Sequence, residues 1–216
     1  MKKIDLNTWS RREHFNFFRG ISHPNFAICA NLDITELYHT SKKNDYSLFK
    51  VMVFLVTKVA NQIEEFRYRT DATREQVVVH EVVHTSFTYL GPSELFCFCT
   101  VDFIDDMRDF YKRTVHSLEL QRGRVVLDCP GYNDNLIYIT SIPWVSFTSV
   151  RHEIDTNKPD SVPRICWGKY VFENQKVLLP FSLTVSHCLM DGIHIGKYFH
   201  EIERLLDSPI FDISMM

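Results

Sequence analysis

The feature that most constrains the fold of this chain is a hydrophobic stripe of helical period that follows a segment of strand period. Between residues 47 and 66, apolar side chains recur every three or four positions, which places them on one face of a long helix. These residues are Leu48, Met52, Leu55, Val59, Ile63 and Phe66. Residues 25–34 alternate in hydrophobicity, as a β-strand does. We therefore expect an α/β protein.

The remaining patterns predict a mixed sheet with about three helices. Further strands are expected in 76–90, 94–103, 135–147, 164–172 and 176–187, and further helices in 105–121 and 193–208. Turns are expected at Gly91–Pro92 and at 173–175, and a loop over 152–164. Because helices and strands do not alternate regularly, a mixed sheet is favoured over a parallel doubly wound one. The expected architecture is a single-domain two-layer sandwich over residues 1–216, with a mixed β-sheet packed against helices.

Charge and composition argue against nucleic-acid and membrane partners. The 216 residues have a formal net charge of −3, and the 24 basic residues are scattered instead of gathered on one face. No apolar run approaches the roughly 20 residues that span a bilayer. The chain starts without the apolar segment of a secretory signal, and its six cysteines form no CxxC pair or disulfide spacing. We therefore expect a cytoplasmic protein.

The segment from His80 to His84 has the letters of the zinc-protease motif, His-Glu-x-x-His. That motif works on a helix, where side chains four residues apart lie on one face and share a metal. Here the flanking and internal residues are mainly valine, which favours a strand over a helix. On a strand the two histidines would be about 13 Å apart, too far to share an ion. We therefore expect no metal at this segment.

A second histidine, His187, ends the apolar alternation that runs through 179–185. Its phase places it on an apolar face at the end of a strand, with Asp191 in position to cap the closing helix. A core histidine satisfied by its neighbours has this pattern. A general base held near its neutral form in an apolar cleft has the same pattern. Spacing alone leaves both interpretations open.

Several longer motifs resemble one known family. The His-x-x-x-Asp-Gly pattern at 187–192 resembles the signature of the CoA-dependent acyltransferases. WSRREHF at 9–15, SIPWVSFTS at 141–149, GKY at 168–170 and LLPFSLTVSH at 178–187 resemble motifs of the trimeric chloramphenicol acetyltransferases, in the same order. ANLDIT at 30–35 and VANQIEEFR at 59–67 also fit that family. The resemblance covers nearly the whole chain and implies the fold of the CoA-dependent acyltransferases.

The resemblance assigns roles to four residues. His187 would be the general base that takes the proton from the primary hydroxyl of chloramphenicol as this oxygen attacks acetyl-CoA. Ser141 would stabilise the oxyanion. Asp191 would form an ion pair with Arg11 that fixes the loop carrying the histidine. Transfer would be direct, without an acyl-enzyme, so Cys188 would be a neighbour and not a nucleophile.

The resemblance also implies a substrate pocket and an assembly. Phe18 and Phe96 match positions of the apolar acceptor pocket, although both would suit a core equally well. Trp144 and Tyr170 fall where the family approaches CoA. The family is a homotrimer with active sites between subunits, so acetyl-CoA, chloramphenicol and two further copies of the chain are the implied partners.

The chain departs from the family pattern at three positions. Ser186 replaces the first of two adjacent histidines, Cys166 replaces a threonine whose hydroxyl holds a water, and Phe18 stands where tyrosine is frequent. The lost hydroxyls bear on the identity of the acceptor more than on the type of reaction. Three hypotheses follow: a chloramphenicol acetyltransferase that confers resistance, an acetyltransferase for another small hydroxyl compound, and a trimer that binds CoA or an apolar ligand without turnover. The presence of all four residues with assigned roles argues against the third.

Overall fold

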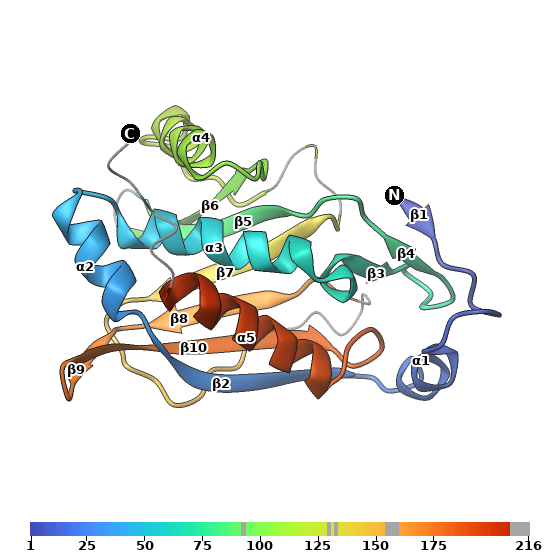
Figure 1. Ribbon diagram of the computed structural model, residues 1–216. Coiled ribbons are helices and arrows are strands. Elements are labelled where there is room, and N and C mark those ends of the chain that lie inside the picture. Colours follow the sequence, from blue (N-terminus) through green and yellow to red (C-terminus); the bar gives the residue numbers. More distant parts are fainter. Residues whose placement is uncertain (92–93, 129–130, 132–133, 154–159, 208–216) are drawn as a thin grey trace.

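A mixed β-sheet runs through the molecule with helices on one of its faces (Figure 1). The computed structural model describes residues 1–91, 94–128, 131, 134–153 and 160–207. Within these ranges the strand order is β2–β10–β8–β7–β5–β6, and β9 extends the sheet beside β10. The strands are β2 (Asn25–Asp33), β5 (His84–Leu90), β6 (Phe96–Val101), β7 (Leu136–Ile142), β8 (Arg164–Gly168), β9 (Val171–Glu173) and β10 (Lys176–Ser186). Parallel pairs β5–β7 and β7–β8 lie between antiparallel ones, which confirms the predicted mixed sheet.

The three predicted helices are present, together with two that the sequence pattern did not reveal. They are α3 (Leu48–Gln62), α4 (Met107–Leu120) and α5 (Gly192–Asp207), and the two additional ones are α1 (Arg12–Phe18) and α2 (Thr35–Lys43). A 3₁₀ turn, η1 (Glu64–Arg67), follows α3. Ser47 and Asp106 cap α3 and α4 by accepting hydrogen bonds from backbone N–H groups of the first turn. None of the helices in the described ranges is long and apolar enough to cross a membrane.

Helix α3 is buried on more sides than its apolar stripe predicts. Val51, Val53 and Val56 lie outside the stripe and are fully buried, because α3 touches α4 and α5 as well as the sheet. Figure 1 shows α3 and α5 side by side across the same face. The core of the protein therefore lies between these two helices and the sheet.

The expected strand over 76–90 is wrong in one respect, because the chain breaks at residues 80–83. The first part is β4 (Val77–Val79), which pairs with β1 (Lys2–Lys3) and β3 (Tyr68–Thr70) in a separate small sheet, and the second part is β5. At the break, the side chain of Asn61 bonds both the N–H and the C=O of Val83, in place of a strand partner. The His80–His84 segment is therefore not helical. His80 Nε2 contacts Asp134, and His84 Nδ1 accepts the N–H of Phe103.

The turn predicted at 173–175 joins β9 to β10, with Asn174 and Gln175 at positive φ. Two other predicted connections fall partly outside the described residues. The Gly91–Pro92 turn reaches into 92–93, and the loop over 152–164 contains 154–159.

Candidate active site

His187 follows the last residue of β10 and lies between two aromatic rings. Its N–H donates to the carbonyl of Pro24, which continues the antiparallel pairing of β10 with β2 by one residue. The imidazole stacks on Phe18 of α1 at 4.0 Å between ring centroids and 7° between planes. Phe26 of β2 packs at 4.4 Å and 34°. Two short-range aromatic contacts restrict how the ring can turn.

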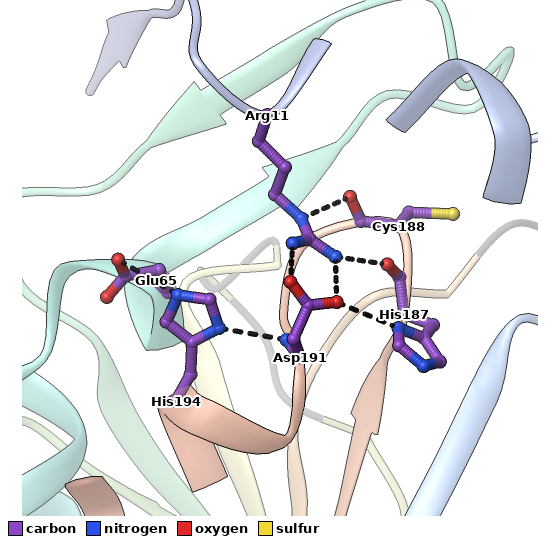
Figure 2. Close-up of polar contacts among 6 residues, drawn as sticks. All are labelled: Arg11, Glu65, His187, Cys188, Asp191 and His194. Carbon is purple, nitrogen blue, oxygen red and sulfur yellow. Dashed lines mark hydrogen bonds and ion pairs between the residues drawn. The ribbon is translucent and has the colours of Figure 1, made fainter. Parts of the chain in front are cut away.

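An ion pair between Arg11 and Asp191 closes the turn that follows His187 (Figure 2). Both terminal nitrogens of the buried Arg11 side chain bond the Asp191 carboxylate, with a distance of 2.7 Å between Nη2 and Oδ1. Nη2 also donates to the carbonyl of His187 at 2.7 Å, and Nε donates to that of Cys188 at 3.2 Å. The planar guanidinium can serve these acceptors together because its donors form a rigid fork. Hydrogen bonding from Arg11 lowers the pKa of Asp191, so this carboxyl is ionised at neutral pH.

The carboxylate of Asp191 binds Arg11 and does not form a proton relay with His187. Its Oδ1 accepts a hydrogen bond from Arg11 and lies 3.2 Å from Nδ1 of His187, a close contact without the geometry of a hydrogen bond. Within the described residues, Nδ1 of His187 has no hydrogen-bond partner. The carboxylate therefore acts on the histidine through Arg11 and the backbone of the turn.

Ser141 is the next-to-last residue of β7, which ends just before Pro143, and it borders two cavities. The larger one, of about 1330 Å³, lies along β5, β6 and β7 and is also lined by Phe96 and Trp144. The smaller one, of about 770 Å³, lies between α3 and the ends of the strands and is also lined by Tyr170. Ser141 thus stands where two substrate-sized cavities meet.

The strand register separates Ser141 from His187 within one chain. Ser141 lies opposite Trp167 of β8, and Trp167 lies opposite Phe181 of β10. Six residues of extended chain run from Phe181 to His187, which corresponds to about 20 Å at ~3.3 Å per residue. The two residues therefore lie toward opposite ends of the sheet.

The other expected site residues divide between these two ends. Phe18, Arg11 and Asp191 accompany His187, whereas the rest accompany Ser141. Phe96 and Trp144 are 55% and 67% exposed, so neither is a core residue. Of the two interpretations that the sequence left open for Phe96, the core one is wrong. Phe18 is half-buried, in contact with His187.

Cys166 and Tyr170 lie near the Ser141 end in different surroundings. Cys166 is fully buried in β8 opposite Ser182, and burial raises the pKa of its thiol to about 12. The thiol is therefore neutral and a weak hydrogen-bond donor. Tyr170 packs against Tyr38 and Phe172, in an aromatic group beside the smaller cavity.

Three residues at the histidine end of the sheet were not predicted from the sequence. Phe26 belongs to the predicted strand 25–34, but the pattern did not show that it touches His187. Glu65 and His194 extend the polar network beyond Asp191 (Figure 2). The position of His194, three residues after a helix-capping aspartate, was the available signal.

The chain is similar to known proteins over nearly its whole length. A family model described as chloramphenicol acetyltransferase matches residues 1–203. The chain is 31% identical to a chloramphenicol acetyltransferase of Staphylococcus aureus, over 96% of both chains. It is 30% identical to chloramphenicol acetyltransferase 2 of Haemophilus influenzae, over 95% of this chain and 97% of that one.

Solved structures confirm the expected fold. A chloramphenicol acetyltransferase superposes with a TM-score of 0.85 at 23% identity, over 96% of this chain and 100% of the other. The dihydrolipoamide acetyltransferase of Azotobacter vinelandii superposes with a TM-score of 0.66 at 14% identity, over 91% and 86%. The family match covers nearly the whole chain, and the chain therefore belongs to the chloramphenicol acetyltransferase family and is an acyltransferase.

Proposed function

We propose that this enzyme transfers the acetyl group of acetyl-CoA to the primary hydroxyl of chloramphenicol and thereby confers resistance to the antibiotic. The observation that carries the proposal is the Arg11–Asp191 pair, which closes the turn behind His187 in a chain of this family. We also propose that residues 1–216 form one domain. The protein would act in the cytoplasm, where acetyl-CoA is made.

His187 is the general base of the proposed reaction. Its Nε2 takes the proton of the acceptor hydroxyl while the oxygen attacks the thioester carbonyl, a contribution of roughly 10²–10⁴-fold. Phe18 and Phe26 support this role, because both pack against the imidazole and restrict its orientation. Arg11 and Asp191 position the ring through the backbone of the turn, and Ser141 donates its hydroxyl to the oxygen on which negative charge develops.

The two cavities at Ser141 suit the two substrates. The larger cavity has Phe96, expected at the apolar acceptor, in its lining; Trp144, expected near CoA, lines this cavity as well. The smaller one is mainly apolar, with Lys169 and Tyr170 in its lining, which suits the pantetheine chain and the phosphates of acetyl-CoA. Acetyl-CoA would supply the acetyl group as a thioester.

The proposed site requires more than one copy of the chain. The separation of about 20 Å between Ser141 and His187 exceeds the reach of one reacting centre. A homotrimer, in which His187 of one subunit faces Ser141 of the next, brings them together. The exposed Phe96 and Trp144 support this arrangement, because a neighbouring subunit would cover them.

A second candidate keeps the reaction and changes the acceptor to another small hydroxyl compound. The buried, neutral Cys166 favours it, because it supplies no hydroxyl at this place. The phenyl ring of Phe18 likewise lacks the hydroxyl of a tyrosine.

The first test measures thiol release from acetyl-CoA with and without chloramphenicol, for the wild type and for His187→Ala. We expect chloramphenicol-dependent release that falls by about 10²-fold or more in the variant. His14→Ala, a change on the first helix away from the ring contacts of His187, is the control and should keep wild-type release. If a folded trimer binds CoA but releases no thiol with chloramphenicol, chloramphenicol is not the acceptor, and another small hydroxyl compound remains as the candidate.

A further inference from the structure

His194 joins the turn of Asp191 to the carboxylate of Glu65, which belongs to another element. It lies in the first turn of that helix and is 13% exposed. Its Nδ1 accepts the backbone N–H of Asp191 at 2.8 Å, and its Nε2 faces Oε1 of Glu65 at 3.4 Å (Figure 2). Glu65 belongs to the turn η1 after α3 and is 25% exposed. The network therefore extends from the His187 turn to the end of α3.

The partners of His194 specify one tautomer. A backbone N–H can only donate, so Nδ1 must present a lone pair to Asp191. The proton of the neutral ring is then on Nε2, where it faces the carboxylate of Glu65. Hydrogen bonding with His194 lowers the pKa of Glu65, so this carboxylate is an acceptor at neutral pH. The two contacts thus require the Nε2–H form, with one ring nitrogen for each partner.

His194 replaces the second half of a capping box. In that motif the side chain at the third helical position accepts the N–H of the capping residue, and the capping side chain accepts an N–H in return. Here the carboxylate of Asp191 binds Arg11 instead of a backbone N–H of the helix, so the second bond of the capping box is replaced by the ion pair. The bond from the Asp191 N–H to His194 is the side-chain contact that fixes the capping residue to α5.

We propose that His194 and Glu65 are positioning residues for the proposed acetyl transfer. Glu65 orients the ring of His194, His194 fixes the backbone of Asp191, and Asp191 holds Arg11, which bonds the carbonyl of His187. Neither residue touches a substrate in this scheme. The kinetic part of the inference rests on the proposed function, whereas the contact itself does not.

The kinetic test compares His194→Ala with His194→Gln. The alanine variant should lose roughly 10–100-fold in kcat, with a smaller change in KM, because the base is misplaced while the cavities at Ser141 are untouched. Glutamine should restore most of kcat, because its amide both accepts and donates. His200→Ala, an exposed histidine on the same helix, is the matched control and should match the wild type.

The second readout requires no acceptor and uses ¹⁵N NMR of the full-length protein. In the wild type, His194 should show an unprotonated Nδ1 and a protonated Nε2, and the Arg11 Nε–H should exchange slowly with solvent. In His194→Ala the Arg11 signal should exchange faster, and in His194→Gln it should stay slow. If chloramphenicol is not acetylated by the wild type, the proposed function fails while this measurement still decides on the pair.

Two results would overturn the inference: a protonated Nδ1 in the wild type, or a folded His194→Ala enzyme with wild-type kcat and a slowly exchanging Arg11 signal. Should the alanine variant not fold, Glu65→Leu replaces it, because leucine fills a similar volume without an acceptor. Glu65→Leu should lose kcat and Glu65→Gln should retain it. Equal kcat in these two variants and the wild type would likewise reject the pair.

Discussion

At the scale of single residues, Arg11 holds together the turn that presents His187. Arg11→Met removes the guanidinium from a carboxylate and two backbone carbonyls. Because it leaves the half-buried carboxylate of Asp191 and two backbone carbonyls without their donor, we expect a loss of roughly 2 kcal/mol in the free energy of unfolding. Arg12→Met is the control, since the exposed Arg12 pairs with the exposed Glu13, and it should cost under about 1 kcal/mol. Urea denaturation of both variants measures the difference, and equal losses would contradict this account.

The same pair predicts how stability depends on pH. Arg11 lowers the folded pKa of Asp191 below its ordinary value of 3.8. A lowered pKa means that the folded state binds the proton less readily, so the contribution is fully present above about pH 4 and is lost as the pH falls through the folded pKa. The difference in unfolding free energy between the wild type and Arg11→Met should therefore shrink as the pH falls below about 4. Urea denaturation at intervals of one pH unit tests this. A difference that does not change with pH would mean that Arg11 does not stabilise the fold through the ionised carboxylate of Asp191.

Single residues also mark how far the sequence could predict the site. His187, Asp191 and Arg11 stand in motifs whose resemblance to the family assigned them a shared role, and the structure brings these three together. Phe26 was missed because its contact with His187 depends on the pairing of β2 with β10, which no local pattern contains. Glu65 was missed for the same reason, since it reaches His194 across more than a hundred residues of chain.

At the scale of elements, substitutions of two glycines should have opposite effects on stability. Gly168 ends β8 in close contact with the segment after β7, whereas Gly196 lies in α5 with open space around it. A Cβ on Gly168 would lie 2.5 Å from the carbonyl oxygen of Val145 and about 3 Å from the ring of Phe147. Since a backbone atom cannot give way cheaply, Gly168→Ala should lower the free energy of unfolding by about 1–3 kcal/mol. Gly196 in α5 meets nothing within 4 Å, so Gly196→Ala should raise it by about 0.5–1 kcal/mol, because alanine favours the helix. Thermal denaturation of the two variants checks the opposite signs, and a neutral Gly168→Ala would show that the segment at Val145 moves aside.

The elements that the sequence predicted share strong periodicity, and those it missed do not. Helix α3 was predicted from its stripe, but its burial on several sides depends on α4 and α5, which pack on it from distant parts of the chain. Helix α1 has only seven residues, too few for a clear period, and α2 is mostly polar. The break between β4 and β5 was hidden because its hydrogen bonds are made with other elements, as those of Val83 are with Asn61. Local patterns therefore predicted the elements, and contacts between distant segments decided their limits.

At the scale of the whole molecule, the opposite positions of Ser141 and His187 predict that activity needs two different subunits. His187→Ala removes the proposed base at one end of the sheet, and Ser141→Ala removes the proposed oxyanion donor at the other end. In trimers assembled at random from equal amounts of both, about a quarter of the sites combine an intact His187 with an intact Ser141 from the neighbour. Each parent alone should retain only a few hundredths of wild-type activity or less. Refolding the mixture should therefore restore about a quarter of wild-type chloramphenicol acetylation.

The control for this experiment mixes His187→Ala with His187→Gln, two lesions at the same end. No pairing of these chains yields an intact site, so the mixture should be as inactive as its parents. The measurement is acetylation rate per subunit after joint refolding, with the trimer isolated by size. Recovery only in the first mixture means that the two ends meet across a subunit boundary. Absence of recovery in both mixtures would contradict the shared site and mean that each chain completes its own. The segments carrying Ser141 and His187 would then have to rearrange, because about 20 Å along the sheet separates the two residues within one chain.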